Sequence, residues 1–142
     1  MMVPLFEVRR LIYSRPMSEK PAVGSIGWVD LTIADAEGIR DFYAEIVGWQ
    51  PEALDMGGYS DFVMKEPESG KSVTGVCHAR GGNADLPPQW LVYFVVVDLD
   101  ASLAAVARRG GKALSAIRSM GPTARYVVIQ DPAGAVCMLY QS

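Results

Sequence analysis

Asp30 and His78 are the two residues of this chain whose type and position suit acid–base chemistry. Asp30 falls inside a β-rich run, where a buried carboxylate is costly unless it is paired. It is expected either to pair with an arginine or a backbone donor, or to act with a shifted pKa as a general base or an anchor for a ligand amine. His78 is the one histidine of the chain and follows an apolar run, so it is either a surface residue or an acid–base group.

Other reactive groups do not form a recognisable catalytic motif. Cys77 and Cys137 are too few for a disulfide framework and are expected to be buried as small hydrophobic residues. The chain contains no G-x-S-x-G, P-loop, C-x-x-C or G-x-G-x-x-G pattern. The pair Gly110-Gly111 ends an expected helix instead of preceding one, which argues against a phosphate-binding loop.

Composition limits the possible partners. The chain has 142 residues, half of them apolar and 20% charged, with a formal net charge of −3. This length predicts one compact domain with a real core. No apolar run reaches the ~18 residues of a membrane span. A mildly acidic domain lacks the basic surface that nucleic acid requires, so we expect no nucleic acid and no membrane partner.

The elements that position these groups occur twice. In the first half, a strand is expected over Ile26–Ile33, followed by Asp35 as a helix N-cap. The helix then carries an apolar stripe and ends at Gly48. Two more strands are expected over Tyr59–Met64 and Ser72–Cys77. The stripe consists of Ile39, Phe42, Tyr43 and Ile46.

The second half repeats this plan 63 residues later. A strand over Trp90–Val97 is followed by Asp98 as N-cap, and Asp98 stands 63 residues after Asp35. Strands over Arg125–Gln130 and Ala135–Tyr140 close the half. The helix stripe of this half consists of Leu99, Leu103, Val106 and Ala107.

The repeat predicts an α+β fold of two βαβββ modules, residues 24–79 and 89–142, joined by a linker over 80–88. Each module has one sheet face uncovered by its helix, so two modules together are expected to form a shared cavity. Residues 1–23 precede the repeat. Residues 1–16 are interpreted as an N-terminal extension or an upstream start, or else as an arm that packs on a partner subunit, and they do not resemble a secretory signal.

Several short motifs make this layout similar to the vicinal-oxygen-chelate superfamily, the glyoxalase, bleomycin-resistance and extradiol-dioxygenase group. They occur in order over roughly residues 24–141. The pieces are Trp28-Val29-Asp30-Leu31, Asp41-Phe42-Tyr43, Val47-Gly48-Trp49, Trp90-Leu91-Val92-Tyr93-Phe94, Asp98-Leu99-Asp100-Ala101, Gly110-Gly111 and Asp131-Pro132-Ala133-Gly134-Ala135.

The resemblance implies four metal-ligand positions, which hold His or Glu in the metal-dependent members. Here they fall on Trp28, Gly75, Leu91 and Met138. Indole and thioether groups do not replace imidazole or carboxylate ligands, and one histidine excludes a two-histidine site within one chain. We therefore expect no metal and no other cofactor.

The expected cavity lining is aromatic and aliphatic. Strand alternation directs Trp28 and Asp30 into the cavity and Leu31 and Ile33 toward the helix. Trp90 is expected at the cavity mouth. The candidate ligand-binding residues are Trp28, Asp30, Trp90, Leu91, Tyr93, Met138 and Tyr140.

Such a lining favours a metal-free protein that binds a small aromatic or apolar molecule, similar to the bleomycin-resistance branch. The resemblance also implies a homodimer, and we expect a cytoplasmic location. Whether the protein is an enzyme stays open at this point. The alternatives are a lyase or isomerase of glyoxalase type, with Asp30 or His78 as the acid–base group, and an accessory module that binds a protein.

Overall fold

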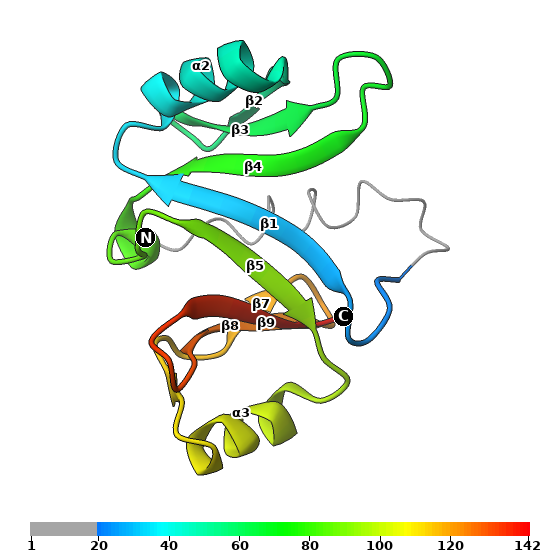
Figure 1. Ribbon diagram of the computed structural model, residues 1–142, viewed down its shortest axis with the longest axis vertical. Coiled ribbons are helices and arrows are strands. Elements are labelled where there is room, and N and C mark those ends of the chain that lie inside the picture. The colour runs from blue at the N-terminus through cyan, green and yellow to red at the C-terminus, as the bar shows by residue number, and fades with distance from the viewer. Residues whose placement is uncertain (1–19) are drawn as a thin grey trace. The chain divides into compact units, whose positions relative to one another are not determined.

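A computed structural model describes residues 20–142 of the chain (Figure 1). The interpretation of residues 1–16 lies outside these described residues. The described chain divides into two compact units, residues 29–90 and residues 20–28 with 91–142. In this part of the chain, no helix is long and apolar enough to cross a membrane.

The first unit has the predicted βαβββ order. Its elements are β1 (Ile26–Ile33), α2 (Ala36–Val47), β2 (Gln50–Asp55), β3 (Ser60–Lys65) and β4 (Ser72–His78). The strands lie in the order β2-β3-β4-β1, with β1 parallel to β4 and the other neighbours antiparallel (Figure 1).

Local sequence explains both ends of α2. The Asp35 carboxylate accepts a hydrogen bond from the Gly38 amide at 3.0 Å and so caps one of the free N–H groups of the first turn. At the other end Gly48 takes a φ of 84°, a left-handed conformation that glycine adopts without strain. The predicted helix boundaries are therefore confirmed.

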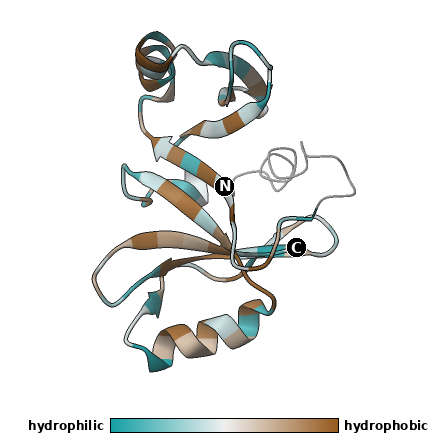
Figure 2. Cartoon of the chain, turned by 45° about the vertical axis from the view of Figure 1, so that its right-hand side comes forward, coloured by the Kyte–Doolittle hydropathy of each residue, from teal (hydrophilic) through white to brown (hydrophobic). Residues whose placement is uncertain are grey.

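The helix covers one face of the first sheet. Ala36 of α2 packs on Phe62, Met64 and Val76, which alternate along β3 and β4. Figure 2 shows the matching alternation of hydrophobic and hydrophilic bands along the strands. The predicted stripe is only half buried, because Phe42 and Ile46 are 52% and 59% exposed.

The second unit follows the same plan with one strand interrupted. Its elements are β5 (Trp90–Val95), α3 (Leu99–Arg108), β6 (Lys112–Ala113), β7 (Arg118–Met120), β8 (Ala124–Gln130) and β9 (Val136–Gln141). Strand β5 is parallel to β9, β8 is antiparallel to β9, and the short strands β6 and β7 both pair with β8.

The second core lies between α3 and its sheet. It consists of Leu99, Val127, Ile129 and Leu139, with Leu103 and Val106 packed against it. Ala107, the last member of the predicted stripe, is exposed instead. A short 3-10 helix, Gly81–Asn83, lies in the predicted linker.

The segment before Trp28 belongs to the second unit because its backbone pairs with β5. The Gly24 amide donates to the Val95 carbonyl at 2.8 Å, and the Val95 amide donates to the Ser25 carbonyl at 3.0 Å. A side chain at Gly27 would lie 2.9 Å from a methyl of Val95, so this approach requires glycine. The α+β class and the two βαβββ modules are confirmed, whereas the cavity shared by the modules stays a prediction.

Candidate functional site

Strand register makes the two units directly comparable. Asp30 of β1 pairs with Gly75 of β4, and Tyr93 of β5 pairs with Met138 of β9. Each partner of the second pair stands 63 residues after its counterpart in the first. Gly75 and Met138 are therefore equivalent positions of the two sheets.

In the second unit, four of the seven candidate ligand-binding residues share one sheet face. Val96 and Leu139 pack against α3, so the alternate residues of the same strands face away from the helix. These alternate residues are all buried, with at most 3% of each side chain exposed. They are Leu91, Tyr93, Met138 and Tyr140.

This face contains three tyrosine rings. The ring centroids of Tyr93 and Tyr126 lie 6.4 Å apart, within the range of a favourable aromatic contact. Tyr93, Tyr126 and Tyr140 each have an interaction partner. We call this surface, made by Leu91, Tyr93, Tyr126, Met138 and Tyr140, the tyrosine face.

Trp28 and Asp30 occupy alternate positions of β1 and are both buried, at 8% and 4% exposure. Asp30 has an interaction partner. In the described part of the chain, no buried side-chain nitrogen or oxygen lacks a hydrogen bond. The interaction of Asp30 agrees with the paired alternative, and both alternatives for this residue stay predictions.

Trp90 belongs to an aromatic cluster of the first unit. Its indole nitrogen donates to the Tyr43 hydroxyl at 3.3 Å, and its ring meets that of Trp49 edge-on with centroids 6.1 Å apart. This cluster packs against the core beneath α2. A shallow groove of about 330 Å³ beside it is lined by Leu31, Ile33, Ile39, Phe42, Tyr43, Pro88, Gln89 and Trp90.

His78 forms a pair with Asp61, a residue that sequence patterns missed. Nδ1 of His78 lies 3.2 Å from Oδ1 of Asp61, and the same oxygen accepts the backbone N–H of His78 at 2.8 Å. The Asp61 side chain is 4% exposed and the His78 side chain 16%. The only sequence signal for Asp61 is a carboxylate inside the expected strand Tyr59–Met64.

Aromatic rings surround the pair. The Tyr59 ring meets the imidazole edge-on with centroids 5.4 Å apart, and the Arg80 guanidinium lies 3.9 Å above the Tyr59 ring. Burial raises the pKa of Asp61, and the hydrogen bonds from His78 oppose that rise. A carboxylate in this position orients the imidazole through Nδ1, and an acid–base role for His78 stays a prediction.

A family model places this architecture among known proteins. Residues 25–139 match the model of the Glyoxalase/Bleomycin resistance protein/Dioxygenase superfamily. The chain belongs to this superfamily. The expected resemblance is thereby confirmed, as is the fold that it implies.

The relatives in the glyoxalase superfamily are longer proteins. "Putative glyoxylase CFP32" of Mycobacterium bovis is 28% identical over 120 residues, which cover 84% of this chain and 46% of that protein. The "Anthracycline biosynthesis protein DnrV" of Streptomyces peucetius is 31% identical over 115 residues, 79% of this chain and 39% of that protein. The chain thus spans less than half the length of the curated relatives it matches.

A solved structure shares the fold. A glyoxalase/bleomycin resistance protein/dioxygenase superfamily member from Vibrio splendidus 12B01 superposes with a TM-score of 0.53 at 13% identity. The match covers 81% of this chain and 97% of the other.

The donor groups do not fit the metal site of the metal-dependent glyoxalase superfamily members. The register confirms that Gly75 and Met138 are equivalent, and Trp28 and Leu91 each stand two residues before the matched pair Asp30 and Tyr93. These positions offer an indole, no side chain, an isobutyl group and a thioether, none of which is a hard ligand. Between residues 20 and 142, no three His, Cys, Asp or Glu side chains group closely enough to hold a metal ion.

Proposed function

We propose that this chain is a small-molecule-binding member of the glyoxalase superfamily that works without a metal and takes a flat aromatic or apolar molecule. The observation that carries the proposal is the donor set. At the four family ligand positions the chain has apolar groups, and the strand register supports their alignment. Binding energy must then come from apolar burial and ring contacts instead of metal coordination.

The tyrosine face supplies the matching chemistry. Its members are apolar or aromatic, and all of them are buried. A ligand that reaches this buried face would gain apolar contact and ring stacking. The name of the relative DnrV refers to anthracyclines, which contain a flat fused-ring system, and so agrees with this ligand class.

A direct test uses the flat quinone 1,4-dihydroxyanthraquinone with the purified full-length protein. We expect saturable binding of one molecule per chain by calorimetry, and a rise in the melting temperature that grows with ligand concentration. Substitution Tyr93→Leu should weaken binding about threefold to tenfold through the loss of a ring contact. The matched control is Phe94→Leu on the same strand, because Phe94 points to the opposite face and is 40% exposed.

Metal analysis tests the other half of the proposal. We expect no stoichiometric metal in the purified protein, and no shift of the melting temperature with nickel, zinc, manganese or iron. One tightly held metal per chain would overturn the proposal. The proposal would also be overturned if flat aromatic compounds did not bind and a protein or a polar ligand bound instead.

The Asp61–His78 pair favours a second candidate function, a metal-free lyase or isomerase with His78 as the acid–base residue. The two candidates differ in turnover. If this protein is such an enzyme, His78→Gln should abolish turnover of a bound substrate and leave its affinity within a few-fold of the wild-type value. Stoichiometric binding with no turnover would exclude the enzyme and leave the first proposal intact.

We also propose that the chain forms a homodimer. It spans only 46% and 39% of its longer relatives, so a second copy would supply a comparable length of folded chain.

A further inference from the structure

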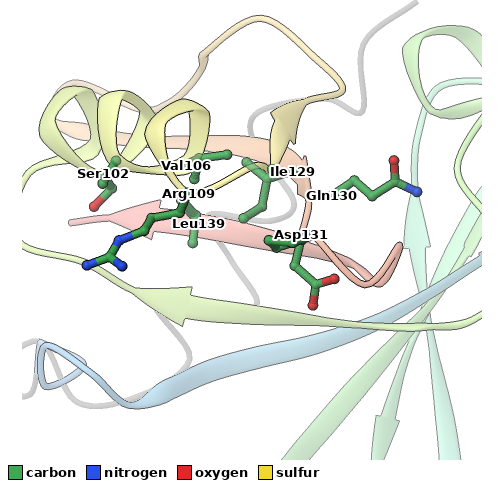
Figure 3. A pocket seen from close by; sticks show the side chains of 10 residues that line it. Ser102, Val106, Arg109, Ile129, Gln130, Asp131 and Leu139 are labelled. Carbon is green, nitrogen blue, oxygen red and sulfur yellow. The ribbon is translucent and has the colours of Figure 1, made fainter.

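A groove in the second unit lies on the helix side of the sheet, opposite the tyrosine face (Figure 3). It has a volume of about 340 Å³, within the range of small-molecule sites. Its floor and walls are apolar, with Ala105 and Val106 from α3 and Ile129 and Leu139 from β8 and β9. Ser102, Arg109, Gln130 and Asp131 supply the polar side chains of its lining.

Comparison of the two helices shows how the lining of this groove differs from that of the groove beside α2. The α3 residues that line it are Ser102, Ala105, Val106 and Arg109. The residues 63 positions earlier, on α2, are Ile39, Phe42, Tyr43 and Ile46. Three of these four positions thus exchange a large apolar side chain for a small or charged one. The groove beside α3 therefore has a hydroxyl and a guanidinium in its lining, whereas the groove beside α2 is lined there by Ile39 and Phe42.

Two of the four polar side chains are already engaged in the turn after β8. The Asp131 carboxylate accepts the backbone N–H groups of Ala133 at 2.8 Å and Ala135 at 3.0 Å. The Gln130 amide donates to the Gly134 carbonyl at 3.1 Å. Both side chains therefore serve the turn itself.

The other two, Ser102 and Arg109, have side chains without a hydrogen-bond or ion-pair partner among residues 20–142. In Figure 3 the guanidinium of Arg109 extends toward the end of α3 that carries Ser102. Arg109 supplies the positive charge of the lining, and the Asp131 carboxylate is held by two backbone N–H groups of its own turn. An anion is the charge complement of the Arg109 guanidinium.

We propose that this groove binds a small apolar carboxylate, with its apolar body against Val106, Ile129 and Leu139 and its carboxylate at Arg109 and Ser102. A guanidinium and a hydroxyl both donate hydrogen bonds to a carboxylate. This site is distinct from that of the proposed function, because it uses the opposite face of the same sheet.

The test compares phenylacetate with its neutral analogue phenylacetamide, by two-dimensional ¹H–¹⁵N NMR of the full-length protein. Phenylacetate should shift the signals of the last turn of α3 and of the turn at Asp131 in a saturable manner. We expect phenylacetamide to bind at least about threefold more weakly, since it lacks the charge that meets Arg109. Added NaCl should weaken the binding of phenylacetate more than that of the amide.

Matched variants locate the site. Arg109→Met should reduce phenylacetate affinity to roughly that of the amide, whereas Arg108→Met should change it less, because Arg108 does not line the groove. Ala105→Phe introduces the residue found at the equivalent position of α2 and should abolish binding by filling the groove. Its control is Ala104→Phe at an exposed position of the same helix.

Equal binding of acid and amide, or signal shifts confined to other parts of the chain, would overturn the proposal. If the Ala105→Phe variant fails to fold, Arg109→Met still tests the proposal, because Arg109 is exposed and its substitution should not disturb the core. Tyr93→Leu should leave phenylacetate binding unchanged, so failure here is distinguishable from failure of the proposed function.

Discussion

Asp61 is only 3% exposed, and its carboxylate lies close to both the backbone N–H and the imidazole Nδ1 of His78. Sequence reasoning identified His78 but not its partner, because the two residues are 17 positions apart and meet only where β3 pairs with β4. The imidazole thereby gains a fixed orientation. A surface histidine without such a partner would rotate freely.

The titration of Asp61 should make the stability of the protein depend on pH in a direction opposite to that of most carboxylates. Burial raises its pKa above the ordinary value of 3.8, so the folded chain holds this proton more tightly than the unfolded chain. The contribution of Asp61 to the free energy of unfolding should fall as pH rises from about 3.8 through the raised pKa. Urea unfolding of wild type and Asp61→Asn over this range measures the difference.

Asp41→Asn provides the control with the opposite sign. The hydrogen bond from Arg40, 2.8 Å long, lowers the pKa of Asp41, so its contribution is lost as pH falls. That effect should be small because Asp41 is exposed to solvent. A wild-type minus Asp61→Asn difference that rises with pH would show that the hydrogen bonds from His78 outweigh burial in setting the pKa of Asp61.

The Cys137 thiol should react slowly with alkylating reagents in the native protein. Burial raises its pKa first of all, and the nearby charge of Asp131 raises it further, so little reactive thiolate forms at neutral pH. We expect iodoacetamide to label Cys137 slowly at pH 7 and quickly after unfolding, as followed by mass spectrometry. Rapid native labelling at Cys137 would show that the thiol is not shielded.

At the scale of elements, both helices begin in the same way. Asp35 accepts from Gly38 and Asp98 accepts from Ala101, each from the third residue beyond the cap. These caps were predictable because they depend on residues within one turn. The exposure of Phe42 and Ile46 was not predictable from the sequence. It depends on the orientation of α2, which is set by the residues of β3 and β4 that the helix contacts.

The effects on stability of substitutions at Asp35, the N-cap of α2, and at Gly38 should be coupled. Alanine normally stabilises a helix interior by about 1 kcal/mol relative to glycine. At this position, however, a Cβ would overlap the Asp35 carboxylate. We expect Gly38→Ala to stabilise the protein by about 1 kcal/mol only in an Asp35→Ala background, and to give little or no gain in the wild type.

A double-mutant cycle from thermal or urea unfolding measures this coupling. Asp35→Ala alone should cost about 1 kcal/mol through loss of the cap. Additive effects of the two substitutions would show that the carboxylate can move aside without losing its hydrogen bond.

At the scale of the whole molecule, the two units follow one plan but differ in the residues that it carries. The equivalent helix positions hold Ile39 and Phe42 in one unit, and Ser102 and Ala105 in the other. The groove beside α3 therefore has Ser102 and Arg109 in its lining, whereas the groove beside α2 has Ile39 and Phe42. The two units share the order and pairing of their strands and helices, whereas their side chains differ and so determine which ligand each unit can bind.

The proposed homodimer makes a prediction at this scale. Sedimentation of the full-length protein should give a mass near twice 15.4 kDa at micromolar concentration. The sedimentation of DnrV, a longer relative of which this chain covers 39%, should be measured for comparison. A mass of one chain across the accessible concentrations would exclude the homodimer and leave the ligand proposals untouched.

The sequence by itself determined the element order, the helix caps, the 63-residue repeat and hence the superfamily. These features depend on neighbours within a few residues, on strand alternation and on the regular spacing of the repeat. The alignment of Gly75 with Met138 also followed from that spacing, and the strand register agrees with it.

Only the tertiary structure decided which side chains meet. It joined Asp61 to His78, placed Trp90 with Tyr43 beneath α2, and left Ser102 and Arg109 at the edge of a groove. Each of these contacts joins residues from different elements, or depends on the space left by their neighbours. Contact and space arise from packing in three dimensions, and residue types along the chain do not specify them.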